Sequence, residues 1–427
     1  MKRFGFYLVC AFTALGLLLS ACAPAAPAPG GAAPAGKSKT VVIGFTASQT
    51  GSLNVESTRQ INGLNLWIEK ANAAGVKLAD GTVVQFSAKF YDDESNKDRV
   101  QSLYTKLINE DKADFLISPY SSGLADAAAV IAEQYGKIMI TTGAASDSTY
   151  QKGYKLVYQA YTPGSRYLTG AFDLLAKLDP NAKKVAIIHE AEKFSTDVCN
   201  AAKAYGTAKG YQIALFESYD SKTTDFAPFI NKIPADVDAI MGGGHFADTS
   251  TFAKQMFEKG VKAKFIALLV APPEPKFVEL GDAASGVIGP SQWEPLAKYS
   301  AESAKAANLE WYGVSVADFT SAYKAKYNED PSYHSAGGYA AGVILQKAIE
   351  KAGVLEAPKI AAALDAMDML TFYGRVKFDT SEKSHGLQIG HDMVYIQWQK
   401  DAQGKLAKQV VWPLAGKSAD AQYPARK

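Results

Sequence analysis

Two short loops carry residue types that could bind a small anion. SPYSSG (118–123) follows the apolar run ADFLI, and TTGAAS (141–146) follows KIMI, so each loop places small and hydroxyl residues directly after a predicted strand. Ser121 or Ser122 could cap the helix that runs to Tyr135, a role that needs no ligand. The same helix N-terminus has free N–H groups and a partial positive charge, which also suit a carboxylate. Residue chemistry alone leaves both interpretations open.

Catalytic signatures are absent from the sequence, so we expect neither an enzymatic reaction nor a cofactor. The chain has no HExxH, GxSxG, CxxC or GxxxxGK[ST] motif. His189-Glu190 ends an apolar strand, and a hydrogen-bonded pair at a loop edge is the interpretation favoured over a catalytic one. Residues 92–94, Asp-Asp-Glu, lack the spaced ligands of a calcium loop and are interpreted as a solvated turn that caps a helix from Ser95. No metal site is expected.

The N-terminus has the features of an exported lipoprotein. Lys2 and Arg3 precede an apolar stretch that is too short to span a bilayer. The residues LSAC then resemble the bacterial lipobox, which predicts a signal peptide over residues 1–21 and a lipid on Cys22. An ordinary signal peptide with an incidental cysteine is the alternative. Residues 22–39 are mostly Ala, Pro and Gly and predict an extended tether.

Charge and cysteine usage exclude two further classes. The chain carries 45 basic and 43 acidic residues, and loss of Lys2 and Arg3 with the signal peptide leaves 43 of each, which makes nucleic acid a poor partner. Cys199 would be the one cysteine outside the signal peptide and the anchor, so no intramolecular disulfide is expected. Its helical surroundings, DVCNAAKAYG, favour a buried structural thiol.

From Thr40 onward, apolar runs alternate with helical patterns. Besides ADFLIS and KIMIT, strands are predicted over 40–46, 83–91, 183–190, 211–219, 236–244 and 262–270. Such alternation predicts mostly parallel sheets covered by helices on both faces, and the length suits two domains. ADFLISPYSSGLADA and VDAIMGGGHFADTS share one layout, which either reflects two similar halves or generic α/β patterning. Strands predicted at 372–380, 393–400 and 408–414 would return to cover both halves.

The order of these segments resembles the branched-chain amino-acid-binding (Leu/Ile/Val-type) periplasmic binding proteins of bacterial ABC importers. The resemblance runs from about Val41 to Trp398 and includes VVIGFTASQTG, FYDDESNKDRV, ADFLISPYSSG, KIMITTGAAS, VAIIHEAEKF and GRVKFD. It implies a two-lobed α/β fold of the type I periplasmic-binding-protein class, in which each lobe is a mostly parallel sheet flanked by helices and three crossovers join the lobes. The implied boundaries are 40–163 with 292–371 for lobe 1, 164–291 with 372–414 for lobe 2, and 415–427 for a C-terminal tail.

The resemblance also implies ligand-binding positions in the cleft. The carboxylate-binding Ser of the family falls on Ser122, with Ser121 adjacent, and the contacts after the next strand fall on Gly143 and Ala145. The family has Thr at position 145, so Ser146 could supply the hydroxyl instead. From lobe 2, the positions that face the ligand fall on Phe194, His245 and Leu269.

At Leu269 the sequence departs from the pattern of the family, and this departure has the largest consequence for the ligand. The family places there the acid that pairs with the α-ammonium group of an amino acid, and burial of an unpaired ammonium group is costly. Glu56 or Asp248 could replace that acid from elsewhere. We otherwise expect a carboxylate or amide ligand with an apolar or aromatic body and no free α-amine.

The expected protein is a monomeric solute receptor that binds a small molecule and delivers it to an ABC permease in the cytoplasmic membrane. It would be exported, anchored to the membrane by lipid, and would catalyse nothing. The alternatives within the same fold are a receptor for an amide, urea or aromatic acid, or a sensor without a transport role.

Overall fold

The computed structural model describes residues 37–296 and 298–426. The predicted signal peptide, Cys22 and most of the predicted tether lie outside these residues. The tether was expected to reach residue 39, but the first strand already begins at Ser38. None of the described helices is both long enough and apolar enough to cross a membrane.

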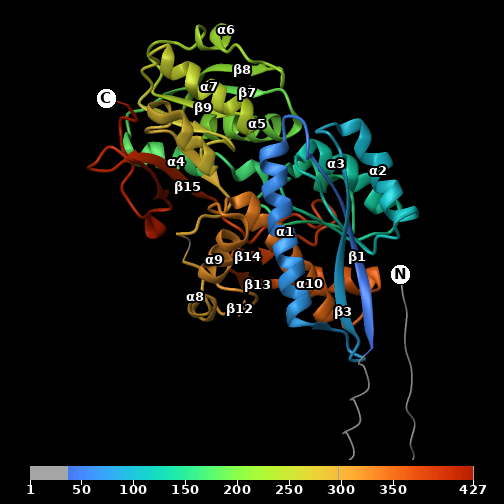
Figure 1. The fold of residues 1–427 in the computed structure, drawn as a ribbon. Coiled ribbons are helices and arrows are strands. Elements are labelled where there is room, and N and C mark those ends of the chain that lie inside the picture. Colours follow the sequence, from blue (N-terminus) through green and yellow to red (C-terminus); the bar gives the residue numbers. More distant parts are fainter. Residues whose placement is uncertain (1–36, 297, 427) are drawn as a thin grey trace, which may run out of the picture. The chain divides into compact units, whose positions relative to one another are not determined.

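A six-stranded sheet is built from the first part of the chain (Figure 1). Its strands, in spatial order, are β2 (Val76–Lys77), β3 (Val83–Asp92), β1 (Ser38–Ala47), β4 (Phe115–Ile117), β5 (Met139–Thr141) and β6 (Val157–Gln159). All neighbours run parallel except β2 and β3. Because successive side chains of a strand point to opposite faces, Phe115 and Ile117 of β4 pack in one core, and Leu116 packs in another.

Helices cover both faces of this sheet, as predicted. On one face lie α1 (Asn54–Ala74), α10 (Tyr333–Ala352) and α11 (Ala357–Asp365). On the other lie α2 (Lys97–Asn109) and α3 (Ser122–Gln134). We call this sheet with these helices the first lobe.

A seven-stranded sheet forms the centre of a second lobe. Its strands, in spatial order, are β16 (Leu406–Trp412), β15 (Val394–Lys400), β11 (Ile288–Ser291), β10 (Phe265–Leu268), β9 (Ala239–Gly243), β7 (Lys184–Glu190) and β8 (Gln212–Tyr219). The strands from β11 to β8 are parallel, and β15 and β16 add an antiparallel edge. The helices of this lobe are α4 (Thr169–Leu178), α5 (Lys193–Ala208), α6 (Ala227–Ile230) and α7 (Phe246–Glu258). Cys199 is fully buried in α5, which confirms a structural thiol.

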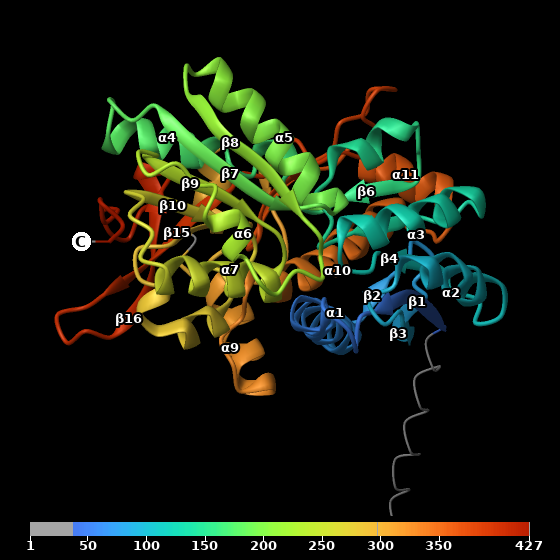
Figure 2. The same ribbon diagram turned by 90° about the horizontal axis from the view of Figure 1, so that it is seen from above.

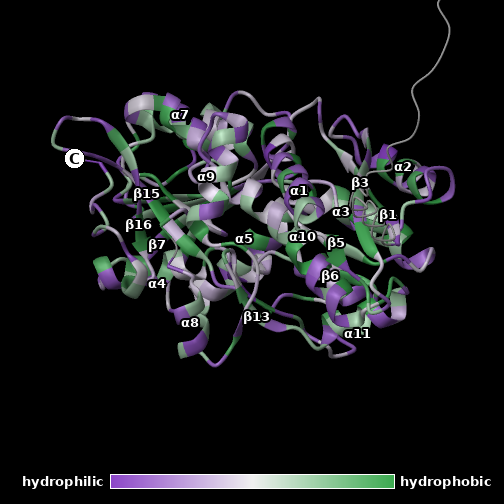
Figure 3. Ribbon diagram, turned by 60° about the horizontal axis from the view of Figure 1, so that its bottom comes forward, coloured by the Kyte–Doolittle hydropathy of each residue, from purple (hydrophilic) through white to green (hydrophobic). Residues whose placement is uncertain are grey.

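Hydropathy follows the layers (Figure 3): the strands are mainly hydrophobic, and hydrophilic residues gather on loops and outer helix faces. A small sheet of β12 (Glu310–Trp311), β13 (Asp368–Thr371) and β14 (Gly374–Lys377) lies beside α8 (Ala301–Ala306) and α9 (Val316–Tyr327) (Figure 1). The expected lobe boundary between residues 371 and 372 falls inside the β13–β14 hairpin. Phe372, Tyr373 and Val376 pack in the core of the first lobe rather than the second.

The chain passes between the two large sheets three times, and hydrogen bonds join the three crossover segments. The backbone N–H of Thr162 donates to Gln292 Oε1 (2.8 Å), and Gln292 Nε2 donates to Tyr167 OH (2.7 Å). Thr162 Oγ1 and His391 Nδ1 are 2.7 Å apart. Residues of all three crossovers therefore enter a single buried network.

Helices α1 and α10 lie side by side with their backbones in contact (Figures 1 and 2). A Cβ atom on Gly63 would lie 1.9 Å from the carbonyl oxygen of Ser335, and one on Gly338 would lie 1.9 Å from that of Gln60. This close crossing needs glycine on both helices. It also brings the N-terminal turns of both helices to the same end of the first lobe.

The turn after β3 differs from the expectation. Asp93 is fully buried rather than solvated, and it accepts hydrogen bonds from Thr46 Oγ1 (2.8 Å) and Ser48 Oγ (2.6 Å). Helix α2 begins at Lys97, and its cap is Asn96. The hydroxyl groups at the end of β1 explain the difference, because they give the carboxylate the partners that burial demands.

Candidate functional site

A small cavity lies where both large sheets end. It has room for about 10 Å³, which is close to the space needed by one water molecule. Its walls come from the loops that follow β4, β5, β6, β9 and β10, and from the first turns of α5 and α10: Tyr120, Ser121, Gly143, Ala145, Tyr161, Tyr167, Phe194, His245, Val270, Tyr333 and His334. Ligands of open parallel sheets bind at this end of the strands.

Five of the residues predicted from the sequence line this cavity: Ser121, Gly143, Ala145, Phe194 and His245. The other three lie buried beside it. The Oγ atom of Ser122 accepts the backbone N–H groups of Ala145 (3.0 Å) and Ser146 (3.2 Å), so it holds the two loops together. Leu269 packs in the core of the second lobe, next to the cavity-lining Val270.

Most of the cavity wall is aromatic. Tyr167 stands edge-on to Phe194 with ring centroids 5.2 Å apart, and Tyr161 lies 5.9 Å from Tyr333. Residue reasoning singled out Phe194 but missed the four tyrosines of the wall. Tyr120 lies within SPYSSG itself, so that motif carried the signal, whereas Tyr161, Tyr167 and Tyr333 stand outside any motif.

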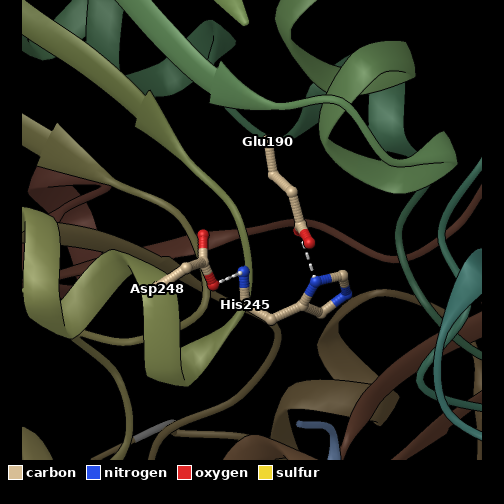
Figure 4. Close-up of side chains that lie close together, drawn as sticks. All are labelled: Glu190, His245 and Asp248. Atoms are coloured by element: carbon tan, nitrogen blue, oxygen red, sulfur yellow. Dashed lines mark hydrogen bonds and ion pairs between the residues drawn. The ribbon is translucent and has the colours of Figure 1, made fainter. Parts of the chain in front are cut away.

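His245 is held by a buried carboxylate of its own lobe. It precedes α7, and its Nδ1 atom lies 2.7 Å from Glu190 Oε2 (Figure 4). Burial alone would lower the pKa of His245, but the charge of Glu190 and its hydrogen bond outweigh burial and raise the pKa to about 10. The imidazole is therefore a cation at neutral pH, and its Nε2 atom is buried without a partner.

Asp248 completes this cluster from the first turn of α7. It accepts the backbone N–H of His245 (2.8 Å; Figure 4). It also accepts the hydroxyl of Tyr219. Burial and the nearby charge of Glu190 raise the pKa of Asp248. Ligand atoms of Glu190, His245 and Asp248 lie within 4.8 Å of one another, a spacing that could suit a metal ion. All three are already engaged with one another or with Tyr219, so we interpret them as a hydrogen-bonded network.

His334 is held in the same way, but by a carboxylate of the opposite lobe. It lies in the first turn of α10, and its Nδ1 atom is 2.6 Å from Oε1 of Glu274, which follows β10. Arg59 of α1 also pairs with Glu274, and with Glu329 at 3.1 Å. Burial would raise the pKa of Glu274, but the charges of His334 and Arg59 outweigh it and lower the pKa to about 2.

A second contact between the lobes runs from α1 to the N-terminus of α7. Glu56 Oε1 accepts the backbone N–H of Phe246 (2.8 Å), where the helix dipole favours a carboxylate. Its other oxygen, Oε2, is buried without a partner. Burial raises the pKa of Glu56, although the charges of His245 and His334 oppose this. Glu56 was expected near the mouth of the pocket; it is fully buried and is not among the residues that line the cavity.

The sequence hypothesis for His189-Glu190 is confirmed in part. His189 Nδ1 lies 2.8 Å from the backbone oxygen of Glu190, which makes a local hydrogen-bonded pair. The carboxylate of Glu190 instead reaches His245, 55 residues further along the chain. No local pattern reveals this contact, nor the one between Glu274 and His334, 60 residues apart.

Sequence comparison identifies the family. A family model described as "Periplasmic binding protein" matches residues 40–404. The leucine-, isoleucine-, valine-, threonine- and alanine-binding protein of Pseudomonas aeruginosa is 26% identical over 367 residues, which cover 85% of this chain and 91% of that protein. Leu/Ile/Val-binding protein homolog 7 of Brucella suis is 25% identical over 408 residues, with 92% and 96% covered.

Solved structures share the fold. The substrate-binding protein of a branched-chain amino acid transporter from Streptococcus pneumoniae, in complex with isoleucine, has a TM-score of 0.70 at 24% identity and covers 88% of this chain and 100% of its own. A solute-binding protein from R. palustris, in complex with benzoate, has a TM-score of 0.72 at 18% identity and covers 91% and 100%. These matches confirm the predicted two-lobed fold. The chain therefore belongs to the periplasmic binding protein family, and its resemblance to the branched-chain amino-acid-binding type is confirmed.

Proposed function

We propose that this chain is an exported solute receptor of an ABC importer, and that its two lobes close around a small carboxylic acid with an apolar or aromatic body. The observation that carries the proposal is the cavity between the sheets, whose walls are largely aromatic. The buried polar atoms without a partner on its lining residues belong to Ser121, Tyr161, His245 and His334. Aromatic walls suit an apolar body, and these polar atoms suit an oxygen-rich head group. The ligand leaves unchanged, since the role is delivery rather than catalysis.

The charges around the cavity favour an acid without an α-amine. Leu269, which stands where the family has an acid, is buried in the core, and none of the lining residues in the described chain carries a carboxylate. Glu190 and Glu274 lie behind the wall, and each already holds an imidazole. Glu56 is the remaining candidate partner for an ammonium group. Because its pKa is raised, Glu56 is protonated more readily than an ordinary surface carboxylate and is less able to pair with an ammonium group.

Calorimetry on the mature domain tests the ligand class. We expect 4-methylpentanoate or benzoate to bind at least about 10-fold more tightly than leucine or valine, because the amino acids must bury an unpaired ammonium group. The bound acid should be recovered unchanged, which separates a receptor from an enzyme. Micromolar binding of leucine, with its deaminated analogue much weaker, would overturn the ligand assignment. Complete absence of acid and amino-acid binding would overturn the receptor assignment as well.

The aromatic-acid form of this proposal has specific support. Five lining side chains are Tyr or Phe, and proteins of the same fold have been solved with benzoate and with 4-hydroxybenzoate. Where the lobes close around a planar ring, aromatic walls of this kind can contact it edge to face. We therefore include benzoate beside the branched acid as a probe.

Lipid attachment at Cys22 completes the proposal, since it would hold the receptor near the membrane that contains the permease. LSAC and the Ala/Pro/Gly-rich segment after it support this anchor. The Cys22→Ala variant should appear in the soluble fraction or remain unprocessed, whereas the wild type should sediment with membranes. Cys199→Ala is the matched control, because that thiol is buried in α5 and should not affect fractionation. A Cys22→Ala variant that is processed and fractionates like the wild type would contradict the anchor.

A further inference from the structure

Two imidazoles from opposite lobes pack edge to face against Tyr120. The ring of His334 lies 5.0 Å from that of Tyr120 at an interplanar angle of 83°, and the ring of His245 lies 5.5 Å away at 81°. Both line the same small cavity. We call His245 with Glu190 the first pair and His334 with Glu274 the second pair.

The two pairs have the same chemistry. In each, a buried carboxylate lies within hydrogen-bond distance of Nδ1, at 2.7 Å in the first pair and 2.6 Å in the second. In each, Nε2 is buried without a partner at the cavity. A carboxylate at Nδ1 fixes the ring orientation. In the first pair it also favours the imidazolium form, in which Nε2 carries a hydrogen and can only donate. The first pair thus offers a charged donor to the cavity, as the cationic state of His245 requires.

On the basis of the proposed function, we propose that the ligand's anionic group accepts hydrogen bonds from Nε2 of His245 and Nε2 of His334. Glu190 and Glu274 then act as positioning residues that hold these two imidazoles from behind. The imidazoles and Ser121 would then hold the head group, while the tyrosines hold the body. Hydrogen bonds to an ionised group are shorter and stronger than neutral ones. The site would select acids over neutral amides of the same shape.

Closure of the lobes assembles the second pair. Glu190 and His245 belong to the same lobe, so the first pair exists whether the lobes are open or closed. Glu274 follows β10 in the second lobe, whereas His334 and Arg59 belong to the first. Separation of the lobes would remove Glu274 from His334, and the second imidazole would lose the group that orients it. An anion bound by both imidazoles therefore favours the closed form.

Glu56 is the group that an ammonium-bearing ligand would use instead. It lies near both imidazoles, whose charges act on its pKa, and its Oε2 atom is buried without a partner. An ionised Glu56 would compete with a ligand anion for the imidazoles. Replacement by Gln keeps the shape and removes the charge, so Glu56→Gln should leave acid binding intact or strengthen it.

The test compares an acid with its primary amide in variants of each imidazole. The probes are whichever of benzoate and 4-methylpentanoate binds the wild type more tightly, and the corresponding amide. Wild type should prefer the acid by at least about 10-fold. His245→Gln and His334→Gln should each weaken acid binding by about 10–100-fold and amide binding by less than about 3-fold. Glu274→Gln should also reduce the preference for the acid over the amide, as the two His variants do.

His385→Gln is the matched control, because His385 is also a buried imidazole beside a carboxylate, Asp365 at 3.0 Å, but does not line the cavity. It should leave both affinities unchanged. Equal binding of acid and amide by the wild type overturns the inference without any variant. Parallel losses of acid and amide in the His variants also overturn it, since they indicate a structural role. If neither probe binds, the proposed function falls and this inference with it.

Discussion

We expect the Arg59→Met variant to lose about 3–5 kcal/mol of unfolding free energy at neutral pH, because it removes one partner of a buried ion pair. The Arg59 side chain is 5% exposed and that of Glu274 is 0% exposed, so the carboxylate cannot be solvated while the lobes are closed. Methionine fills most of the space of the buried arginine side chain, so the loss of unfolding free energy should come from the missing charge rather than from a cavity. Urea denaturation of the mature domain measures it.

Arg99→Met is the matched control for this prediction. Arg99 pairs with Glu94 at the surface, where the side chains are 40% and 54% exposed, and exposed pairs contribute about 0–1 kcal/mol. Equal losses in the two variants would contradict the role of the buried pair. Part of the Arg59→Met loss should appear as lobe opening, which small-angle scattering detects as a larger radius of gyration.

The stability of the Arg59→Met variant relative to the wild type should depend on pH, and the sign of this dependence follows from the pKa of Glu274. In the wild type, His334 and Arg59 overcome burial and lower the pKa of Glu274 from its ordinary 4.5 to about 2. A carboxylate with a lowered folded-state pKa contributes stability above its unfolded pKa, and that contribution is lost as the pH falls through the folded value. Without Arg59 the pKa is lowered less. The stability gap between wild type and variant should therefore narrow as the pH falls from about 4.5 to about 2.

The sequence predicted the fold wherever the signal is local. The apolar run 183–190 became β7 almost to the residue, and the glycine- and serine-rich loops after β4 and β5 reached the cavity. The order of such segments along the chain was enough to indicate two parallel sheets. Each of these features depends on neighbours within a few residues, which periodicity can detect.

The electrostatic part of the site could not be predicted in this way. Arg59 and Glu274 are 215 residues apart, and each by itself has the pattern of an ordinary charged residue in a helix or loop. The burial of Asp93 could not be predicted either, although its partners are closer in the sequence. The hydroxyl groups that donate to it come from the end of the neighbouring strand. A buried charge is recognised by its partners, and these are known only once the chain has folded.

The close contact between helices α1 and α10 predicts the second large effect on stability. We expect Gly338→Ala to lower the unfolding free energy by about 2–3 kcal/mol, although alanine favours a helix over glycine by about 1 kcal/mol. The new Cβ atom would lie 1.9 Å from the carbonyl oxygen of Gln60, and a backbone atom cannot swing away as the end of a side chain can. Helices α1 and α10 must then separate. Thermal and urea denaturation should both show the loss.

The same substitution should also weaken ligand binding by roughly 10-fold or more. Gln60 Nε2 donates to the backbone oxygen of Ser118 (2.9 Å) at the start of SPYSSG, and α1 and α10 carry Arg59 and His334, so a shift of either helix moves the cavity wall. Gly416→Ala, at the end of the short helix η4 (Leu414–Gly416), is the control, because its Cβ atom would meet only the Cγ atom of Pro413 at 4.0 Å, an ordinary contact. It should change stability by less than about 1 kcal/mol. If Gly338→Ala proves as mild as Gly416→Ala, the helix crossing does not hold the site in place.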